Sequence, residues 1–370
     1  MRILFVGDET VFPVELVDLV AAMGSDWEVE RCANADAAMA RTAASPLDVI
    51  LVAPGLPDLP PATLLGQVRT LRPETSRIAV IDGQHSPAAR IIGLAHRFLP
   101  TPLAPEVLLE AIGSLEELRE LLDNPELRTR IGRVEQLPSP PQLYLRLMSA
   151  LEVDDSASAA DIAGLVSGDP GIAAKVLQLC NSAYFSAGRT ITDLRAAVTR
   201  LGIATLRDLV LASEVFSMPA TPGVDRAAMQ ARALLAARLA KRMLPESSAE
   251  LGATAALLAD IGLLLPGVHD ERQPAVEGDD RPGHTQAGAY LLGLWGLPMP
   301  IIEAVAFHRT PARSSTRSFW VTGAVHTAMA LAAGEEPDQA YLARTGVIAR
   351  LPEWREFAES LSAPATAAID

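Results

Sequence analysis

The chain has 370 residues, of which 49% are apolar and 21% are charged, and its formal net charge at pH 7 is −14. This length and composition predict two or three well-packed domains and exclude a mainly disordered chain. The acidic balance disfavours nucleic acid and anionic membrane as partners, because both bind basic surfaces. The sequence runs into a predicted strand without an apolar signal segment, and its two cysteines imply neither a disulfide framework nor a zinc cluster. We therefore expect a cytoplasmic protein.

The first 115 residues alternate short apolar runs with amphipathic stretches. Repeated βα units of this length predict a doubly wound, flavodoxin-like parallel sheet of five strands, with its functional site at the carboxyl ends of the strands. The expected strands are 3–6, 27–32, 48–53, 77–82 and 97–99, and the expected helices lie near 12–23, 35–43, 61–71 and 87–94.

A longer helix is expected over residues 105–122. Its apolar residues recur at spacings of three and four and form a stripe made of Leu108, Ile112, Leu115, Leu118 and Leu122. Such a stripe packs on its own domain or pairs with a second chain, and the sequence leaves both open. Asp123–Asn124–Pro125 breaks the pattern, so we expect a linker over residues 121–136.

The remainder of the chain has helical periodicity throughout. Ser158 and Asp161 form a capping box, and Asp169–Pro170 is typical of a helix start. Further helices are expected near 227–243, 252–265, 286–294, 301–308 and 319–332. The sequence therefore predicts an all-α domain over 137–335, followed by a helical extension and tail over 336–370 to which we assign no function.

Residues 1–120 resemble a two-component receiver domain in the order of their elements and in three segments: Phe5–Glu9, Leu47–Ala53 and Phe98–Pro102. Receivers accept a phosphoryl group on an aspartate after the third strand, beside a Mg²⁺ ion, a lysine and a hydroxyl residue. The resemblance places Ala53 at the acceptor, Thr101 at the lysine and Asp82 at the hydroxyl residue. Gly7 replaces one of the paired acids, which leaves Asp8 and Glu9.

These replacements predict a pseudo-receiver, because a methyl group cannot be a nucleophile and no cation remains to balance the phosphoryl charge. Asp58 is an alternative acceptor, but loop aspartates usually form turns. Asp8, Glu9 and Asp82 could also supply oxygen ligands to a weak Mg²⁺ site. We interpret them as solvated charges at a loop edge.

Residues 137–332 resemble the HDOD family, the non-enzymatic relatives of the HD and HD-GYP phosphohydrolases. The segments that carry this resemblance are Leu137–Pro141, Asn181–Phe185, Ala197–Gly202, His284–Leu292, Trp295–Pro298 and Glu303–His308. The resemblance implies an all-helical HD-like domain without turnover.

A working HD site binds metal through histidines and aspartates on several helices, and the metal activates water. Here the His-Asp pair reads Ala259–Asp260, and the helix near 227–238 has no histidine. The remnant is Asp260, His284 and His308, with His326 as a less secure member. Histidines on apolar faces are more often core residues than ligands, so we expect no metal and no cofactor. We also expect Asp260 to hydrogen bond to His284 or His308, because a buried charge must be paired.

The resemblances imply a bacterial signalling adaptor that acts through protein–protein contacts with a sensor kinase, a diguanylate cyclase or a phosphodiesterase. Two alternatives remain. One is a metal-dependent phosphohydrolase or cyclic-dinucleotide phosphodiesterase that uses Asp260, His284 and His308, and the other is a nucleotide-sensing binding module. A homodimer through the receiver domain or through the 105–122 helix is also open.

Overall fold

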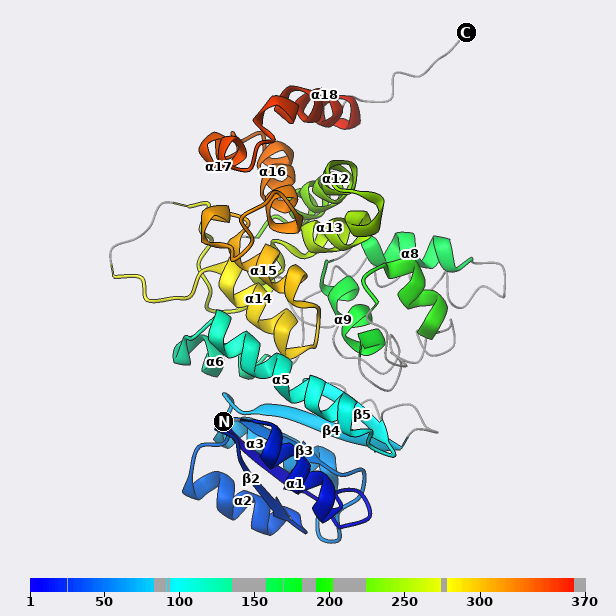
Figure 1. The fold of residues 1–370 in the computed structure, drawn as a ribbon, viewed down its shortest axis with the longest axis vertical. Coiled ribbons are helices and arrows are strands. Elements are labelled where there is room, and N and C mark those ends of the chain that lie inside the picture. The colour runs from blue at the N-terminus through cyan, green and yellow to red at the C-terminus, as the bar shows by residue number, and fades with distance from the viewer. Residues whose placement is uncertain are drawn as a thin grey trace.

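The computed structural model describes residues 1–24, 26–82, 91, 94–134, 158–168, 170–181, 191–201, 224–273 and 278–362. An N-terminal sheet with its helices lies at one end of the molecule, and a purely helical part forms the other (Figure 1). The predicted combination of a parallel sheet with an all-α part is confirmed.

The sheet has five parallel strands in the order β2-β1-β3-β4-β5. The strands are β1 (Arg2–Val6), β2 (Glu28–Cys32), β3 (Val49–Val52), β4 (Ser76–Asp82) and β5 (Arg97–Thr101). All of β3 and nearly all of β1 is buried, which explains why these segments read as continuous apolar runs. The strand order reverses between β1 and β3, so a crevice is expected where these two strands end.

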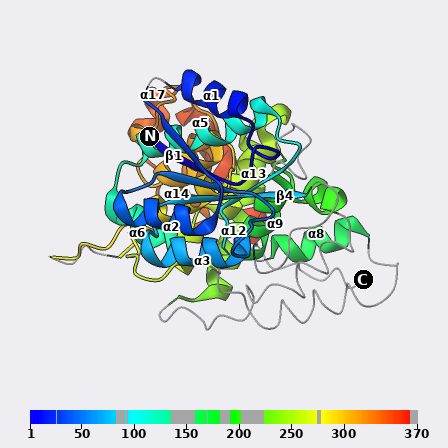
Figure 2. The ribbon, with the colours of Figure 1, turned by 90° about the horizontal axis from the view of Figure 1, so that it is seen from below.

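Four described helices cover the sheet. Helix α1 (Val14–Met23) packs beside α5 (Pro105–Leu121), and α2 (Ala35–Ala44) packs beside α3 (Pro61–Leu71) on the opposite face (Figure 2). The helix expected at 87–94 lies almost entirely outside the described residues.

The apolar stripe of α5 is buried within the chain. Leu108, Ile112 and Leu118 are fully enclosed, and Leu115 and Leu122 are nearly so. Leu118 reaches α14 (His284–Leu294), where Gly293 leaves room for its side chain. The stripe therefore packs inside its own chain, while a homodimer through another surface of the domain stays a prediction.

The expected linker contains a helix, α6 (Pro125–Gly132). Asn124 accepts hydrogen bonds from the backbone N–H groups of Glu126 and Leu127, and Pro125 occupies the first turn, where its missing N–H costs nothing. The residues that end one helix thus begin the next. Arg77 donates a 2.9 Å hydrogen bond to the Gly132 carbonyl, so the segment packs against the sheet domain.

Buried hydrogen bonds join the two parts of the chain. The Arg97 guanidinium donates to the carbonyl oxygens of Gly293 (2.7 Å) and Leu294 (3.1 Å) at the end of α14. The Gln178 side chain, on α9 (Pro170–Asn181), donates to the His96 carbonyl oxygen at 2.8 Å. Both contacts fix the edge of the sheet at β5 against the helical part.

The helical part is built around a central group of packed helices. Its described elements include α8 (Ala159–Ser167), α9, α12 (Arg226–Met243), α13 (Glu246–Leu258), the 3₁₀ helix η2 (Ile261–Leu264), α14, α15 (Met299–Phe307) and α16 (Val321–Ala333), followed by α17 (Gln339–Arg344) and α18 (Leu351–Ser362). The capping box of Ser158 and Asp161 is confirmed. Several sequence predictions lie outside the described residues: Leu137–Pro141, Asp169, Ser182–Phe185 and Gly202.

One helical stretch of the described chain, Glu246–Leu264, is long and apolar enough by composition to cross a membrane. Within this stretch, 72% of the most apolar 18 residues is buried inside the fold. Its apolar residues therefore serve the packing of the helical core.

Candidate functional site

The crevice at the end of β1 and β3 is filled by an apolar side chain. Phe12 is fully buried there, with its ring edge-on to Phe5 at a centroid distance of 5.0 Å. A Cβ atom on Gly7 would lie 2.5 Å from the Cβ of Ala53 and 3.1 Å from the Phe12 ring. Gly7, Phe12 and Ala53 are thus closely packed, and an acidic side chain at residue 7 would have to displace Ala53 or the Phe12 ring.

The remaining acids of this crevice have local partners. Asp8 Oδ1 accepts hydrogen bonds from the Thr10 hydroxyl (2.5 Å) and the Thr10 backbone N–H (3.0 Å), which lower the pKa of Asp8. Glu9 pairs with Arg31 at 2.7 Å. Backbone pairing sets Asp82 opposite Thr101, but the Asp82 side chain lies outside the described residues. Among the side chains that the structure describes, Asp8 and Glu9 belong to no cluster of metal-ligand type.

Asp58 has a structural role. Its two carboxylate oxygens accept hydrogen bonds from the backbone N–H groups of Ala35 (3.0 Å) and Asp36 (2.9 Å) at the start of α2. These bonds lower the pKa of Asp58. Asp58 therefore joins its loop to the start of α2, and the hydrogen bonds give this carboxylate a structural role.

In the helical part, Asp260 lies at a break in the backbone. The prediction of one continuous helix over 252–265 is wrong, because α13 ends at Leu258 and η2 begins at Ile261. The reason is a close crossing of two backbones: a Cβ atom on Gly262 would overlap the His284 carbonyl oxygen and lie 2.9 Å from the Gly288 amide nitrogen. The glycines let η2 approach the first turn of α14, and this approach brings Asp260 beside His284.

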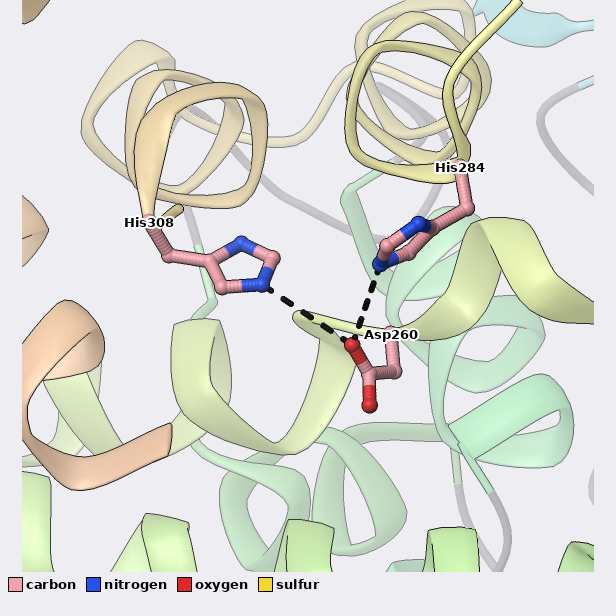
Figure 3. Close-up of side chains that lie close together, drawn as sticks. All are labelled: Asp260, His284 and His308. Atoms are coloured by element: carbon pink, nitrogen blue, oxygen red, sulfur yellow. Dashed lines mark ion pairs between the residues drawn. The ribbon is translucent and has the colours of Figure 1, made fainter. Parts of the chain in front are cut away.

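Three side chains converge at this break (Figure 3). Asp260 Oδ1 lies 3.4 Å from His284 Nε2, at the start of α14, and 3.8 Å from His308 Nε2, at the end of α15. Their ligand-type atoms lie within 4.8 Å of one another, and all three residues are buried. The structure thus brings together the three residues that the sequence selected.

The direct hydrogen bonds to Asp260 come from an arginine. Asp260 Oδ2 accepts bonds from Arg232 Nε (3.0 Å) and from an Arg232 terminal nitrogen (2.7 Å), and Arg272 lies 3.6 Å away. The expected histidine contact is also present, since His284 Nε2 lies 3.4 Å from Asp260 Oδ1, and Arg232 is an additional partner that was not predicted. Burial raises the pKa of Asp260, but its contacts with His284, His308 and Arg232 outweigh burial and hold the pKa well below the usual range.

Arg232 was not predicted from the sequence, because the resemblance to HD sites calls for a histidine on this helix and gives no role to an arginine. The pairing could have been anticipated, because a buried Asp260 requires a positively charged partner. Helix α12 directs Met229, Ala233 and Ala236 into the core, so an arginine on that side is a candidate. Arg232 shares that inward side of α12, next to Ala233.

Hydrogen bonds assign the proton positions on the two site histidines. His308 Nδ1 lies 3.0 Å from the Val305 carbonyl and donates to it, so the Nε2 lone pair faces Asp260. Burial lowers the pKa of His308 to about 4, so this ring is neutral at pH 7. His284 Nδ1 accepts from the Glu271 backbone N–H at 3.2 Å, which leaves the proton on Nε2, toward Asp260. That Nε2 has no hydrogen-bond partner among the described residues, so its 3.4 Å contact is electrostatic.

His326 has both nitrogens engaged in structural bonds. Its Nδ1 donates to the His308 carbonyl (2.6 Å), and its Nε2 accepts from the Asp338 backbone N–H (2.8 Å). It therefore ties α16 to the end of α15 and has no lone pair left for a metal. Asn181 is likewise structural, since its amide bonds to the backbone N–H and carbonyl of Ile191, both at 2.7 Å.

A cavity of about 250 Å³ opens beside the cluster. Positive and negative side chains both line it: Arg232, Arg272 and Arg309 on one hand, and Asp260, Glu335, Glu336 and Asp338 on the other. The lining has four negative and three positive side chains, so it does not select an anion.

Comparisons with known proteins identify the helical part. A relative, an uncharacterised protein of Treponema pallidum (strain Nichols), is 26% identical over 196 residues, which is 48% of this chain and 38% of that protein's length. The MmoQ response regulator of Methylococcus capsulatus is 22% identical and aligns over 58% of this chain and 97% of its own, with a TM-score of 0.46. A protein of Shewanella amazonensis, named as a phosphohydrolase, is 22% identical over 65% of this chain and 96% of its own, with a TM-score of 0.36. Residues 137–275 match the family model of the HDOD domain, so the chain carries an HDOD domain behind its N-terminal parallel sheet.

Proposed function

We propose that this chain is a non-catalytic signalling adaptor of the cytoplasm. Its HDOD domain binds no catalytic metal, its receiver-like domain accepts no phosphoryl group, and it acts through contacts with other signalling proteins. The partner classes that the family resemblance implies are a sensor kinase, a diguanylate cyclase and a phosphodiesterase.

The observation that carries this proposal is the pairing of Asp260 with Arg232. In metal-dependent hydrolases the metal supplies positive charge and activates the attacking water. Here the Arg232 guanidinium supplies the positive charge through two hydrogen bonds to Asp260 Oδ2. A guanidinium is always protonated and has no lone pair, so it neither activates water nor accepts a proton. Ala259, beside Asp260, adds no ligand.

The receiver-like domain supports the same conclusion independently. Phe12 and Ala53 fill the end of the crevice with apolar atoms, and a methyl group cannot attack a phosphoryl donor. Asp58, the nearby carboxylate, uses both oxygens to bind the start of α2.

One rival has an observation in its favour. Asp260 Oδ1 and the His308 Nε2 lone pair face each other, and Glu271 lies 3.2 Å from His284 Nδ1. If the His284 proton moved from Nε2 to Nδ1, that ring would donate to Glu271 and free Nε2 for a metal, as in carboxylate–histidine–metal arrangements. These residues would hold a metal ion that supplies an activated water. Such an ion would meet a carboxylate that Arg232 already neutralises, which is why we favour the adaptor.

The test is hydrolysis by the full chain of bis(p-nitrophenyl) phosphate and of a cyclic dinucleotide, with Mn²⁺, Fe²⁺ or Zn²⁺ added. We expect the wild-type chain to show no more turnover than Asp260→Ala, which lacks the central carboxylate. Turnover that disappears in Asp260→Ala would establish the hydrolase and refute the adaptor. Tight dinucleotide binding without turnover would favour the nucleotide-sensing alternative instead.

A further inference from the structure

We propose that helix α18 covers a docking surface on α12 and α16, and that an acidic amphipathic helix of a partner protein displaces it. This inference rests on the proposed adaptor function, because it assigns one of the surfaces through which an adaptor would act. Figure 1 places α18 next to α16 and α12, at the end of the helical part that lies away from the sheet domain.

Helix α18 is short and amphipathic. Its buried residues recur at spacings of three and four, and they are Leu351, Trp354 and Ala358. Its exposed side carries three acids, Glu353, Glu356 and Glu359. The helix has 12 residues, and an isolated helix shorter than about 12–15 residues is marginal in water. The surface under α18 therefore supplies most of what holds this segment in place.

One fully buried aromatic side chain anchors α18. Trp354 is 1% exposed and stacks on Phe319, with ring centroids 5.3 Å apart. Its indole Nε1 has no hydrogen-bond partner among the described residues. The nearby Trp320 is satisfied, since its Nε1 donates to the Ser248 hydroxyl at 3.1 Å. Burial of an unsatisfied N–H offsets part of the stabilisation from the Trp354 ring, so α18 is held more weakly than its buried surface suggests.

Two exposed ion pairs join α18 to distant parts of the chain. Glu353 lies 3.7 Å from Arg242 on α12, and Arg355 pairs with Glu336 ahead of α17. All four side chains are at least 40% exposed, and ion pairs in such positions contribute little to stability. The polar contacts therefore orient α18 without fastening it.

A glycine allows α18 to move without α17. Gly346 has φ = +76°, and no described atom lies within 4 Å of a Cβ added there. Helix α17, which precedes it, is held by its own contacts. Tyr341 and Leu342 are buried, and the Asp338 backbone N–H donates to His326 Nε2 at 2.8 Å. Rotation at Gly346 thus releases α18 and leaves α17 in place.

The surface under α18 is basic. Helix α12 contains five basic residues and no acidic one, in a chain whose net charge is −14. Arg238, Lys241 and Arg242 are exposed in its last two turns. Of these, Lys241 pairs with Glu250 of α13, while Arg242 faces α18. The occupant that fits is therefore an acidic amphipathic helix with an aromatic anchor, as α18 itself demonstrates.

The first arm of the test is hydrogen–deuterium exchange of the full wild-type chain, resolved by mass spectrometry of its peptides. We expect the amides of residues 351–362 to exchange at least about tenfold faster than those of α16, a difference of about 1.4 kcal/mol in the free energy of opening. Exchange of α18 as slow as that of α16 would make α18 an integral part of the core and would overturn the proposal.

The second arm uses a synthetic peptide with the sequence of residues 347–362 as the probe. Its binding to full-length chains is measured by fluorescence anisotropy. We expect the peptide to bind Trp354→Ala at least about tenfold more tightly than the wild type, because the variant's own α18 has lost its anchor. A control peptide with lysine at its three glutamate positions should not bind. Equal binding to the wild type and Trp354→Ala, or equal binding of both peptides, would overturn the proposal.

A matched pair of charge variants locates the binding surface. In the Trp354→Ala chain, Arg242→Glu should weaken peptide binding at least about tenfold. Arg41→Glu makes the same change of charge on α2, where Arg41 is 46% exposed in the sheet domain, and should leave binding unchanged. Equal effects of the two changes would show attraction by net charge alone and refute the assigned surface.

A milder variant covers the case in which Trp354→Ala fails to fold by circular dichroism. Glu353→Arg sets a like charge against Arg242 and keeps the buried anchor, so α18 should exchange about threefold faster and the peptide should bind about threefold more tightly than to the wild type. No change in either readout would contradict the proposal.

Sedimentation of the wild type and Trp354→Ala completes the test. A concentration-dependent dimer that Trp354→Ala abolishes would assign the surface to α18 of a second copy and overturn the partner-helix proposal. Failure here is distinguishable from failure of the adaptor proposal, because metal-dependent turnover is measured at Asp260 and does not require release of α18.

Discussion

Replacement of Arg232 by methionine tests the energetics of the buried cluster. The change keeps an unbranched side chain but leaves the Asp260 carboxylate, 3% exposed, without its two direct hydrogen bonds. Removal of one partner of a buried ion pair typically costs about 3–5 kcal/mol. Arg272 at 3.6 Å and His284 at 3.4 Å remain near the carboxylate, so we expect the lower end of that range.

A loss of about 3 kcal/mol corresponds to a fall in Tm of about 6 °C, at about 2 °C per kcal/mol for a chain of this size. The assay is thermal unfolding at pH 7, followed by circular dichroism at a helical wavelength. Arg238→Met is the matched control, because Arg238 lies exposed on the same helix and its replacement should leave the Tm nearly unchanged.

The pH dependence of this loss follows from the sign of the Asp260 pKa shift. The folded-state pKa of Asp260 lies below its unfolded value of about 3.9, so the ionised group stabilises the fold at higher pH and this stability is lost as the pH falls through the folded-state pKa. Loss of Arg232 removes one of the contacts that lower the pKa of Asp260, so the pKa rises from its wild-type value and the carboxyl is protonated at a higher pH. The difference in Tm should therefore narrow below about pH 5. An Arg232→Met variant as stable as Arg238→Met at pH 7, or equally destabilised at pH 7 and pH 4, would refute this reasoning.

Three further predictions concern packing and burial. Gly262→Ala should destabilise the fold by about 3 kcal/mol or more, because the added Cβ meets the α14 backbone. Gly113→Ala is the control: nothing lies within 4 Å of the added Cβ, so this change should stabilise α5 by about 0.5–1 kcal/mol. Urea unfolding compares the two variants. Phe12→Ala should lower the free energy of unfolding by about 3–5 kcal/mol in the same assay, because Phe12 is fully buried. The change creates no phosphoryl acceptor, so mass spectrometry after acetyl phosphate treatment should find no phosphorylated chain. Burial lowers the pKa of Lys175 to about 7, so the folded state binds fewer protons than the unfolded state above pH 7, and stability should rise with pH by up to about 1.4 kcal/mol per unit. Lys175→Met should remove that slope between pH 7 and 9 in thermal melts, and the exposed Lys241→Met should keep it.

Much of the architecture follows from local sequence patterns. Continuous apolar runs such as Val49–Val52 are typical of strands buried on both faces, and the structure places this run at the centre of the sheet. The capping box at Ser158 needs only residues within one turn, so it could be identified without tertiary information. The three residues Asp260, His284 and His308 were selected from spaced motifs, and they converge.

The features that escaped prediction depend on contacts between distant segments. The helix through Asp260 breaks because Gly262 meets the backbone of α14, a crossing that the local apolar pattern does not encode. Arg232 pairs with Asp260 across 28 residues of sequence, and its place on the inward side of α12 does not by itself reveal which residue it pairs with. Phe12 reads as an ordinary apolar residue at the start of a helical pattern, and only the fold places it in the crevice against Gly7 and Ala53.

The most direct test of the central claim is the metal content of the full chain. Elemental analysis is made on protein purified without chelator and without a metal-affinity tag, for the wild type and for Asp260→Ala. We predict far less than stoichiometric zinc, iron and manganese in both proteins, because Arg232 already neutralises Asp260. Stoichiometric metal in the wild type that is lost in Asp260→Ala would contradict this prediction and show that the cluster is a metal centre.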